Sequence, residues 1–361
     1  MNSKKVVVKI GTKLLAKNSS FNMNFMESIS RSIKSLQQEG HQILIVSSGA
    51  TYIGKIEFNF TNSDKTIEQQ IYAACGQPLL IDAWRNAAGQ AGLNVAQFLL
   101  TQEDIFFRKR FLYVREVLQY LLNQGIIPIV NENDAVAIQG STFGENDLLA
   151  AKTAVSLFPS DLLILLCEQE GVFTCNPDYN PDAQLITNVE SGEILEGCNF
   201  SASEGISRGG MSAKIRAALL ASRCGVRTVI ANGKHKNIIE DIIHGKQMGT
   251  VFPEHNPIVG YKSWLMMQEP VGSIVVNPGA KKAIKEGGSL LPVGIINCQG
   301  DFFGGDTVRI VSDNQNVAIG ITNYSSAEIS LLSGRHSSDI DVILGHNNGA
   351  EVVHRSKMVC L

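Results

Sequence analysis

The sequence predicts an α/β protein, in which a three-layer α/β/α domain with a mostly parallel sheet is followed by a small β-rich domain. Short aliphatic runs alternate with helical stretches over residues 1–255, and short, turn-rich runs follow them. Hydrophobic residues make up 44% of the 361 residues and charged residues 18%. This balance suffices for large buried cores and excludes a disordered chain.

Six aliphatic runs in the first part lack polar residues at alternate positions, which favours strands buried on both faces. Helical stretches lie between them, and three of these end at glycines, which commonly follow the last helical turn. Such strand–helix–strand repetition predicts parallel pairing with helices on both faces of the sheet. The expected strands are residues 6–10, 43–47, 95–100, 126–130, 162–166 and 227–231. The expected helices are 26–38, 111–122 and 212–224, which end at Gly40, Gly125 and Gly225.

The second part is expected to begin after a linker. Pro253, Pro257 and Pro270 bracket residues 256–270, and clustered prolines are typical of connecting segments. Residues 271–361 then read as short strands and two short helices. The strands are predicted at 273–276, 307–311, 317–321 and 351–354, and the helices at 280–286 and 326–332.

Charge and cysteine content exclude several classes of protein. Thirty-one Lys and Arg against 34 Asp and Glu give a net charge of −3, which argues against a basic surface for nucleic acid. The seven cysteines form no CxxC pair, so we expect neither a disulfide framework nor a metal site built from protein side chains. The most apolar run, 162–166, is too short to span a membrane, and no signal-peptide pattern precedes the first strand. We therefore expect a cytoplasmic protein.

The residues that follow the first two strands are candidates for binding, because ligands of open α/β sheets bind at the carboxyl ends of strands. Lys9 and Gly11 end the first strand, and a lysine beside a glycine suits a phosphate group. Ser48 and Gly49 follow the second strand, where small residues let backbone amides face an anion. Taken alone, the lysine is better explained as part of an ordinary surface loop.

Three further polar stretches are candidates. Residues 131–134 are four polar side chains that directly follow a buried strand, more than a turn requires. Asn146 and Asp147 open a helix, where they can cap it, bind an ammonium group or orient a lysine. A Gly-rich loop leads into the helix that carries Lys214 in its first turn. A cation in the first turn of a helix opposes the helix dipole, so its position is mildly unfavourable unless an anion is bound nearby.

These stretches together resemble the amino acid kinase family, in its branch that phosphorylates glutamate, and the C-terminal part resembles a PUA domain. The resemblance implies ATP-dependent phosphorylation of the γ-carboxylate of L-glutamate, the first step towards proline, with Mg²⁺ bridging ATP oxygens. The kinase strings are VVVKIGTKLL, VSSGA, AACGQ, LLTQEDI, RFLYVR, IIPIVNENDAVA, FGENDLLAA, GVFTCNP, NPDAQLI and GGMSAKIRAA. The PUA strings are GSLLPVGI, GDTVRI, ILGH and VVHR.

The resemblance also implies roles for individual residues. Lys9 and Lys214 would stabilise the transferring phosphoryl group, and Asp147 would orient both lysines. The substrate-binding residues would be Ser48, Gly49, Asp134 and Asn146. The nucleotide-binding residues would be Lys9, Gly11, Cys167, Glu168, Arg208, Gly209, Gly210, Met211 and Lys214.

Departures from the family pattern are found among the residues that would bind the nucleotide. Cys167 and Glu168 stand where the family usually has Thr-Asp, and Arg208 replaces a small hydroxyl residue. These departures predict an altered nucleotide affinity, and a regulatory paralogue with weakened catalysis is the alternative that they support. Family enzymes that act on other substrates are disfavoured by the PUA-like part and by the string NENDAVA.

RNA binding through the PUA-like part is a further alternative. Residues 271–361 contain 7 Lys and Arg against 8 Asp and Glu, whereas an RNA-binding domain usually carries a basic patch. Neither nucleic acid nor a membrane is therefore expected as a partner. The resemblance implies a homo-oligomer, and the lability of an acyl phosphate suggests hand-off to a glutamyl phosphate reductase.

Overall fold

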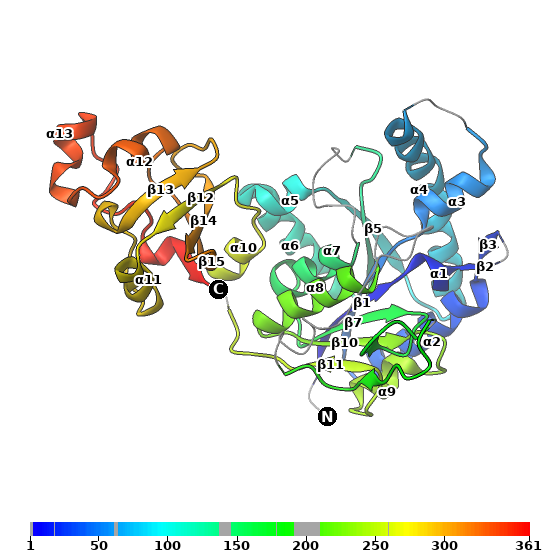
Figure 1. The fold of residues 1–361 in the computed structure, drawn as a ribbon. Coiled ribbons are helices and arrows are strands. Elements are labelled where there is room, and N and C mark those ends of the chain that lie inside the picture. The colour runs from blue at the N-terminus through cyan, green and yellow to red at the C-terminus, as the bar shows by residue number, and fades with distance from the viewer. Residues whose placement is uncertain are drawn as a thin grey trace. The chain divides into compact units, whose positions relative to one another are not determined.

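The computed structural model describes residues 3–17, 19–60, 64–136, 146–177, 179–190, 210–258 and 260–361. The chain divides into two compact units, Met1–Pro257 and Ile258–Leu361. The first unit is built on a seven-stranded sheet and the second on a separate five-stranded sheet (Figure 1).

The large sheet has the strand order β11-β10-β7-β1-β4-β6-β5. Its pairs are parallel, except that β10 and β11 are antiparallel. The six strands predicted from the sequence are confirmed, and β11 is an addition. The strands are β1 (Lys5–Ile10), β4 (Gln42–Ser47), β5 (Val95–Leu100), β6 (Ile127–Glu132), β7 (Leu162–Cys167), β10 (Arg227–Asn232) and β11 (Thr250–Phe252).

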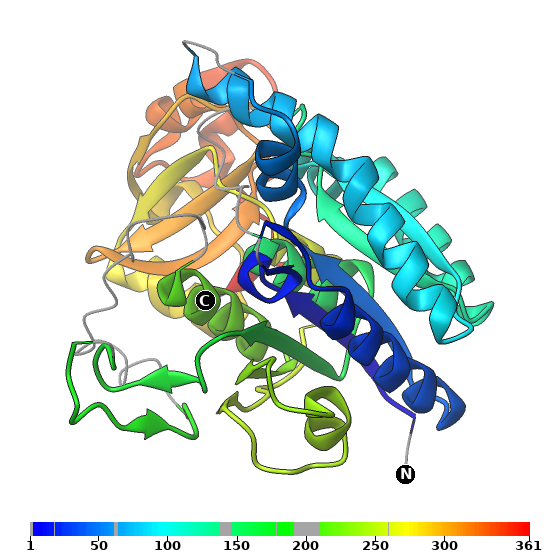
Figure 2. The same cartoon turned by 90° about the vertical axis from the view of Figure 1, so that its right-hand side faces the viewer.

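Helices cover both faces of this sheet, which confirms the three-layer α/β/α architecture. Alternate residues of β1, such as Val6 and Val8, enter a core with three helices on one face. Lys9 faces the other side, towards two further helices. Figure 2 shows α2 and α4 running over the first face. The first face carries α2 (Met23–Gln38), α4 (Lys65–Gln90) and α9 (Ile238–Ile243), and the other α6 (Arg108–Asn123), α7 (Asn146–Lys152), the π-helical η1 (Thr153–Leu157) and α8 (Met211–Arg223).

Helix α2 shows how the sequence specifies these layers. The Asn22 side chain caps the helix by accepting a hydrogen bond from the Phe25 amide. Met26, Ile29 and Ile33 repeat at helical spacing and are buried in the core. Burying each such side chain contributes about 1.5–3 kcal/mol. Gly40 has φ +90°, a conformation that favours glycine, and the glycines after α6 and α8 also have positive φ.

Shorter elements complete the first unit. Helix α3 follows β4 directly and packs against α4, while two small hairpins lie outside the large sheet. These elements are α1 (Thr12–Leu15), β2 (Ala16–Lys17), β3 (Ser20–Phe21), α3 (Ala50–Glu57), α5 (Gln102–Phe106), β8 (Val172–Phe173) and β9 (Leu185–Ile186).

The second unit contains a five-stranded sheet of order β13-β12-β14-β15-β16 around its own apolar core. Neighbouring strands are antiparallel, except that β12 and β14 are parallel. The two predicted helices and three of the four predicted strands are confirmed. The elements are β12 (Gly272–Val276), α11 (Pro278–Lys285), η3 (Pro292–Gly294), β13 (Ile295–Gln299), β14 (Thr307–Ser312), β15 (Gln315–Ile321), α12 (Ser326–Leu332), η4 (Ser337–Asp339), α13 (Ile340–Leu344), η5 (Arg355–Lys357) and β16 (Met358–Cys360).

The strand predicted at residues 351–354 is wrong. Val352 and Val353 are buried side by side in the core, and Val353 forms only an isolated bridge to Leu290. The chain then enters η5, whose first turn is capped by His354. The final strand comes afterwards, as β16.

Residues 256–270, expected to be a linker, contain a helix that the sequence did not predict. This helix, α10 (Tyr261–Met266), buries Trp264, Leu265 and Met266 and contacts β15, β16 and η5. It therefore contributes packing to the second unit. Among the described residues, no helix is both long enough and apolar enough to cross a membrane.

Candidate active site

The middle of the large sheet is where its topology favours a ligand site. The strand order places β1 between β4 on one side and β7 on the other. The chain continues from β1 to β4 in one direction and from β7 to β10 in the other, so the connections diverge between β1 and β7. Ligands of open α/β sheets bind at the carboxyl ends of strands beside such a switch point. Lys9, Ser48 and Cys167 lie at the carboxyl ends of β1, β4 and β7, respectively.

Two lysines from different elements converge there on one carboxylate. Lys9 lies on β1 and Lys214 on α8, while Asp147 lies in the first turn of α7. The Lys9 Nζ is 2.6 Å from Asp147 Oδ1, and the Lys214 Nζ is 3.1 Å from Asp147 Oδ2. The structure thus brings together the three residues to which the resemblance assigns a catalytic role.

Burial sets the electrostatics of this cluster. Lys9, Asp147 and Lys214 are 4%, 1% and 7% exposed. Burial lowers the pKa of Lys9 from its ordinary value; Asp147 opposes this shift, and Lys214 adds to it. Burial alone would raise the pKa of Asp147, but the two lysines outweigh it and hold that pKa below its usual range. Asp147 is therefore ionised at neutral pH and fixes both ammonium groups in place.

The predicted substrate residues Ser48 and Asn146 are in direct contact. The Asn146 side-chain amide donates to Ser48 Oγ at 3.1 Å, and its oxygen accepts from the Glu132 amide at 3.4 Å. Because Asn146 directly precedes Asp147, the start of α7 joins this pair to the lysine cluster. Gly49 precedes α3 with φ +110°, which an L side chain adopts only with strain.

A pocket of about 310 Å³ opens beside the end of β6. Asp134 lines it together with Glu132, Asn133 and Gln77, and apolar residues of α4 and β5 form further walls. Behind it, Asn131 donates to Gln77 Oε1 at 2.8 Å and ties β6 to α4. The pocket offers carboxylate and amide oxygens to a small polar ligand.

The predicted nucleotide residues that the structure describes lie at the carboxyl ends of β1 and β7 and at the start of α8. Gly11 precedes α1, and Gly210, which has no side chain to cap the first amides of the helix, precedes α8. Met211 begins that helix and is partly buried. Such a helix start suits a phosphate group. Arg208 and Gly209 lie outside the described residues.

Cys167 and Glu168 are part of the same region. The Cys167 thiol donates to the Gln169 carbonyl at 3.4 Å, and burial raises its pKa, with Lys214 opposing the shift. Cys167 therefore stays a thiol and is poorly suited to act as a nucleophile. Glu168 forms an ion pair with Lys234 at 2.8 Å, which links the ends of β7 and β10.

Comparison with known proteins identifies the family. Residues 4–232 match the amino acid kinase family, and residues 272–344 match the PUA domain. The chain belongs to the amino acid kinase family. Glutamate 5-kinase from Shewanella halifaxensis is 41% identical, covering 99% of this chain and 98% of the relative. Glutamate 5-kinase from Thermus thermophilus is 37% identical, covering 99% and 97%.

A solved structure supports the fold of this amino acid kinase. A UMP kinase from Bacillus anthracis matches with a TM-score of 0.50 and 17% identity, covering 72% of this chain and all of that one. At this identity the likeness concerns the fold alone. The amino acid kinase fold and the additional PUA domain were both expected from the sequence, and both are confirmed.

Two residues at this candidate site, Gln77 and Lys234, were not predicted from the sequence. Gln77 stands inside the string AACGQ but received no role, because its contact with Asn131 joins residues 54 positions apart. Lys234 lies two residues after β10, at a strand end for which the sequence predicted no candidate. Its position shortly after a predicted strand is the signal that could have identified it.

Proposed function

We propose that the chain transfers the γ-phosphoryl group of ATP to the γ-carboxylate of L-glutamate, forming γ-glutamyl phosphate and ADP. This would be the first step of proline biosynthesis, and the enzyme a phosphotransferase with a carboxyl acceptor. The observation that carries the proposal is the Lys9–Asp147–Lys214 cluster next to the Ser48–Asn146 pair. Full-length similarity to proteins named glutamate 5-kinase supports it.

The cluster suits phosphoryl transfer, because this reaction depends on positioning and charge neutralisation. A γ-carboxylate oxygen of glutamate attacks the terminal phosphorus of ATP, and the bond from that phosphorus to the ADP oxygen breaks. Negative charge on the transferred group faces the ammonium groups of Lys9 and Lys214, which Asp147 holds. Removing one such charge-stabilising group commonly lowers the rate about 10²–10³-fold.

Glutamate would lie between the cluster and the end of β6. Ser48 and Asn146 offer hydroxyl and amide groups for its polar atoms, and Gly49 lets the backbone come close. The α-ammonium group needs acceptors, which Asp134 and Glu132 provide from the 310 Å³ pocket. Placing the ammonium group there leaves the γ-carboxylate to point towards the lysines.

ATP would lie over the ends of β1, β7 and β10. The start of α8, with Gly210 and Met211, fits its phosphates. Cys167 and Glu168 would contact the nucleotide from β7. The predicted roles of Gly11, Arg208 and Gly209 at the phosphates belong to the same proposal.

We propose that Mg²⁺ reaches the site with ATP. Among the described residues, no three His, Cys, Asp or Glu side chains cluster as a metal site would require. Asp147, the carboxylate of the cluster, is already shared by two lysines. This donor set fits an ion that would be held mainly by phosphate oxygens. The ion would supply positive charge to neutralise the reacting phosphoryl group.

Three expectations about the protein's surroundings remain predictions. The resemblance implies a homo-oligomer, which light scattering would test. The lability of γ-glutamyl phosphate favours transfer to a glutamyl phosphate reductase, and failure of the two proteins to co-purify would count against it. A cytoplasmic location is expected from the sequence alone.

Trapping the product tests the function. Purified protein is incubated with ATP, Mg²⁺ and hydroxylamine, which converts an acyl phosphate to a hydroxamate. We expect hydroxamate with L-glutamate but not with aspartate, N-acetylglutamate or carbamate. Lys214→Ala should lower turnover about 10²–10³-fold, while Lys246→Ala, on an exposed side chain, should leave it unchanged. Folded protein without any glutamate-dependent turnover would favour the regulatory alternative.

A further inference from the structure

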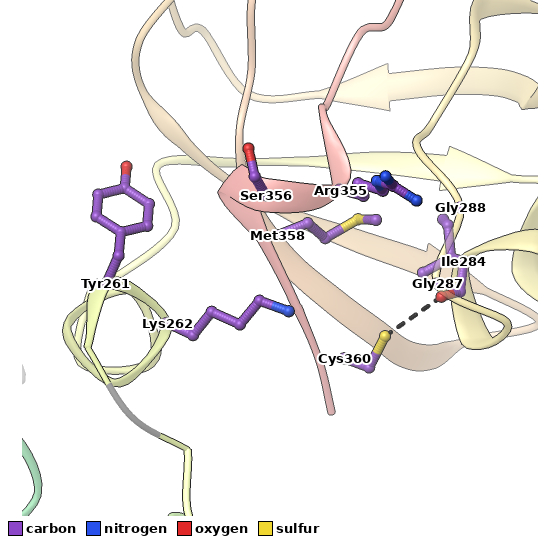
Figure 3. Close-up of a pocket in the computed structure, with 9 residues that line it drawn as sticks. All are labelled: Tyr261, Lys262, Ile284, Gly287, Gly288, Arg355, Ser356, Met358 and Cys360. Carbon is purple, nitrogen blue, oxygen red and sulfur yellow. Dashed lines mark hydrogen bonds between the residues drawn. The ribbon is translucent and has the colours of Figure 1, made fainter.

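A pocket of about 530 Å³ is lined only by residues of the second unit. Its walls come from α10, the end of α11, η5 and β16 (Figure 3). Small-molecule sites commonly have volumes of about 300–1,000 Å³. The pocket shares no residue with the proposed kinase site.

Two cations from different elements line this pocket. Lys262 extends from α10 along the pocket wall, and Arg355 reaches it from η5 (Figure 3). Within the described part of the chain, neither side chain forms an ion pair, and none of the lining residues is acidic. The nearest acid in sequence, Glu286, lies 4.0 Å from Lys282. Two unpaired cations facing one cavity favour an anionic ligand.

The floor of the pocket is apolar. Ile284 and Met358 are 0% and 4% exposed at its base, and the ring of Tyr261 stands at its edge (Figure 3). Apolar walls with a few charged groups are typical of sites that fix one end of a small organic molecule. A bare inorganic ion would leave this apolar surface uncovered.

The charge of the second unit argues against a long polyanion. Residues 258–361 contain eight Lys and Arg and nine Asp and Glu, whereas nucleic-acid surfaces depend on an extended excess of basic residues. Two of these eight basic residues, Lys262 and Arg355, line the pocket. We propose that the pocket binds a small organic anion, with its carboxylate or phosphate between Lys262 and Arg355 and its apolar body over Met358.

An exposed thiol in the pocket provides the readout. Cys360 lines the cavity, and its Sγ donates to the Ile284 carbonyl at 3.5 Å. The full-length protein is treated with N-ethylmaleimide, and alkylation at Cys360 is followed by mass spectrometry of its peptide. The probe is phenyl phosphate, and benzyl alcohol is the neutral control of similar size. We expect phenyl phosphate to slow alkylation of Cys360 and benzyl alcohol to have little effect.

Matched variants connect protection to the two cations. Lys262→Gln and Arg355→Gln should each raise the phenyl phosphate concentration for half-protection about tenfold, as expected for losing one charged hydrogen bond. Lys357→Gln is the control, because Lys357 lies on the same short helix but its Nζ is 3.5 Å from Asn323. It should behave as the wild type.

Three results would overturn the proposal. Equal protection by benzyl alcohol would show that the pocket is only apolar. Unchanged protection in both glutamine variants would show that the cations do not hold the ligand. Protection by a single-stranded RNA oligonucleotide, without protection by phenyl phosphate, would assign the surface to a polynucleotide instead.

Discussion

Replacing Asp147 with asparagine should change how activity depends on pH as well as how fast the enzyme works. The carboxylate holds two buried ammonium groups at 2.6 and 3.1 Å. The asparagine has nearly the same shape but carries no charge. Leaving such charges uncompensated commonly destabilises a protein by about 3–5 kcal/mol.

The sign of the pH effect follows from the forces on Lys9. Burial lowers its pKa, Asp147 raises it, and Lys214 lowers it. Without the carboxylate, the two lowering influences act unopposed, so the pKa of Lys9 falls further and the amine loses its proton at lower pH. Because the protonated amine neutralises the phosphoryl group, the variant should lose activity at lower pH than the wild type does. It should recover relative activity as the pH falls.

The assay is glutamate-dependent ADP release by Asp147→Asn and wild type, measured from pH 6 to 9. At neutral pH we expect a loss of about 10²–10³-fold in kcat. In the plot of activity against pH, the decline at high pH should begin at a lower pH in the variant than in the wild type. Asp82→Asn is the control, because Asp82 is an exposed carboxylate paired with Arg85 and should leave the profile unchanged. A uniform loss at every pH in folded Asp147→Asn would refute the charge argument for Lys9.

Three further predictions concern binding and stability. Ser48→Ala removes the 3.1 Å contact with Asn146, so KM for glutamate should rise about tenfold while KM for ATP stays constant. If steady-state titrations show equal rises in the two KM values, Ser48 does not belong to the glutamate site. Glu168→Gln breaks the partly exposed pair with Lys234, so stability should change by less than about 1 kcal/mol while KM for ATP rises several-fold; an unchanged KM would remove Glu168 from the nucleotide site. Gly54→Ala would place a Cβ 2.0 Å from a backbone oxygen of α4, so urea denaturation should show a loss of about 1–3 kcal/mol, and wild-type stability would contradict the close helix packing.

The large sheet could be predicted because its strands are buried on both faces. Short apolar runs between helices, such as residues 162–166, are typical of parallel strands that are buried on both faces. Helix α4 was not predicted, although it is 26 residues long, because Pro78 lies inside it and its apolar residues face several neighbours. Local sequence patterns therefore predicted the elements with a regular distribution of apolar residues and did not predict α4, which is packed on several sides.

The candidate site shows the same limit. Lys9 and Ser48 could be predicted from the sequence, because they lie at or just after the ends of β1 and β4, where ligands of open α/β sheets bind. The convergence of Lys9 and Lys214 on Asp147 joins residues far apart in the chain, so only the folded structure supplies its distances. The wrong strand at 351–354 has a similar cause, because tertiary packing of Val353 against Leu290 decided its conformation.

The central claim is that a glutamate carboxylate oxygen becomes bonded to phosphorus, and isotope transfer tests it most directly. Glutamate labelled with ¹⁸O in its γ-carboxylate is incubated with ATP, Mg²⁺, hydroxylamine and the full-length protein. Hydroxylamine attacks the acyl carbon and releases phosphate with the bridging oxygen. The account predicts phosphate that carries one ¹⁸O atom, detected by its ³¹P NMR isotope shift. Unlabelled phosphate that accumulates together with ADP would contradict the account, because water would then be the acceptor.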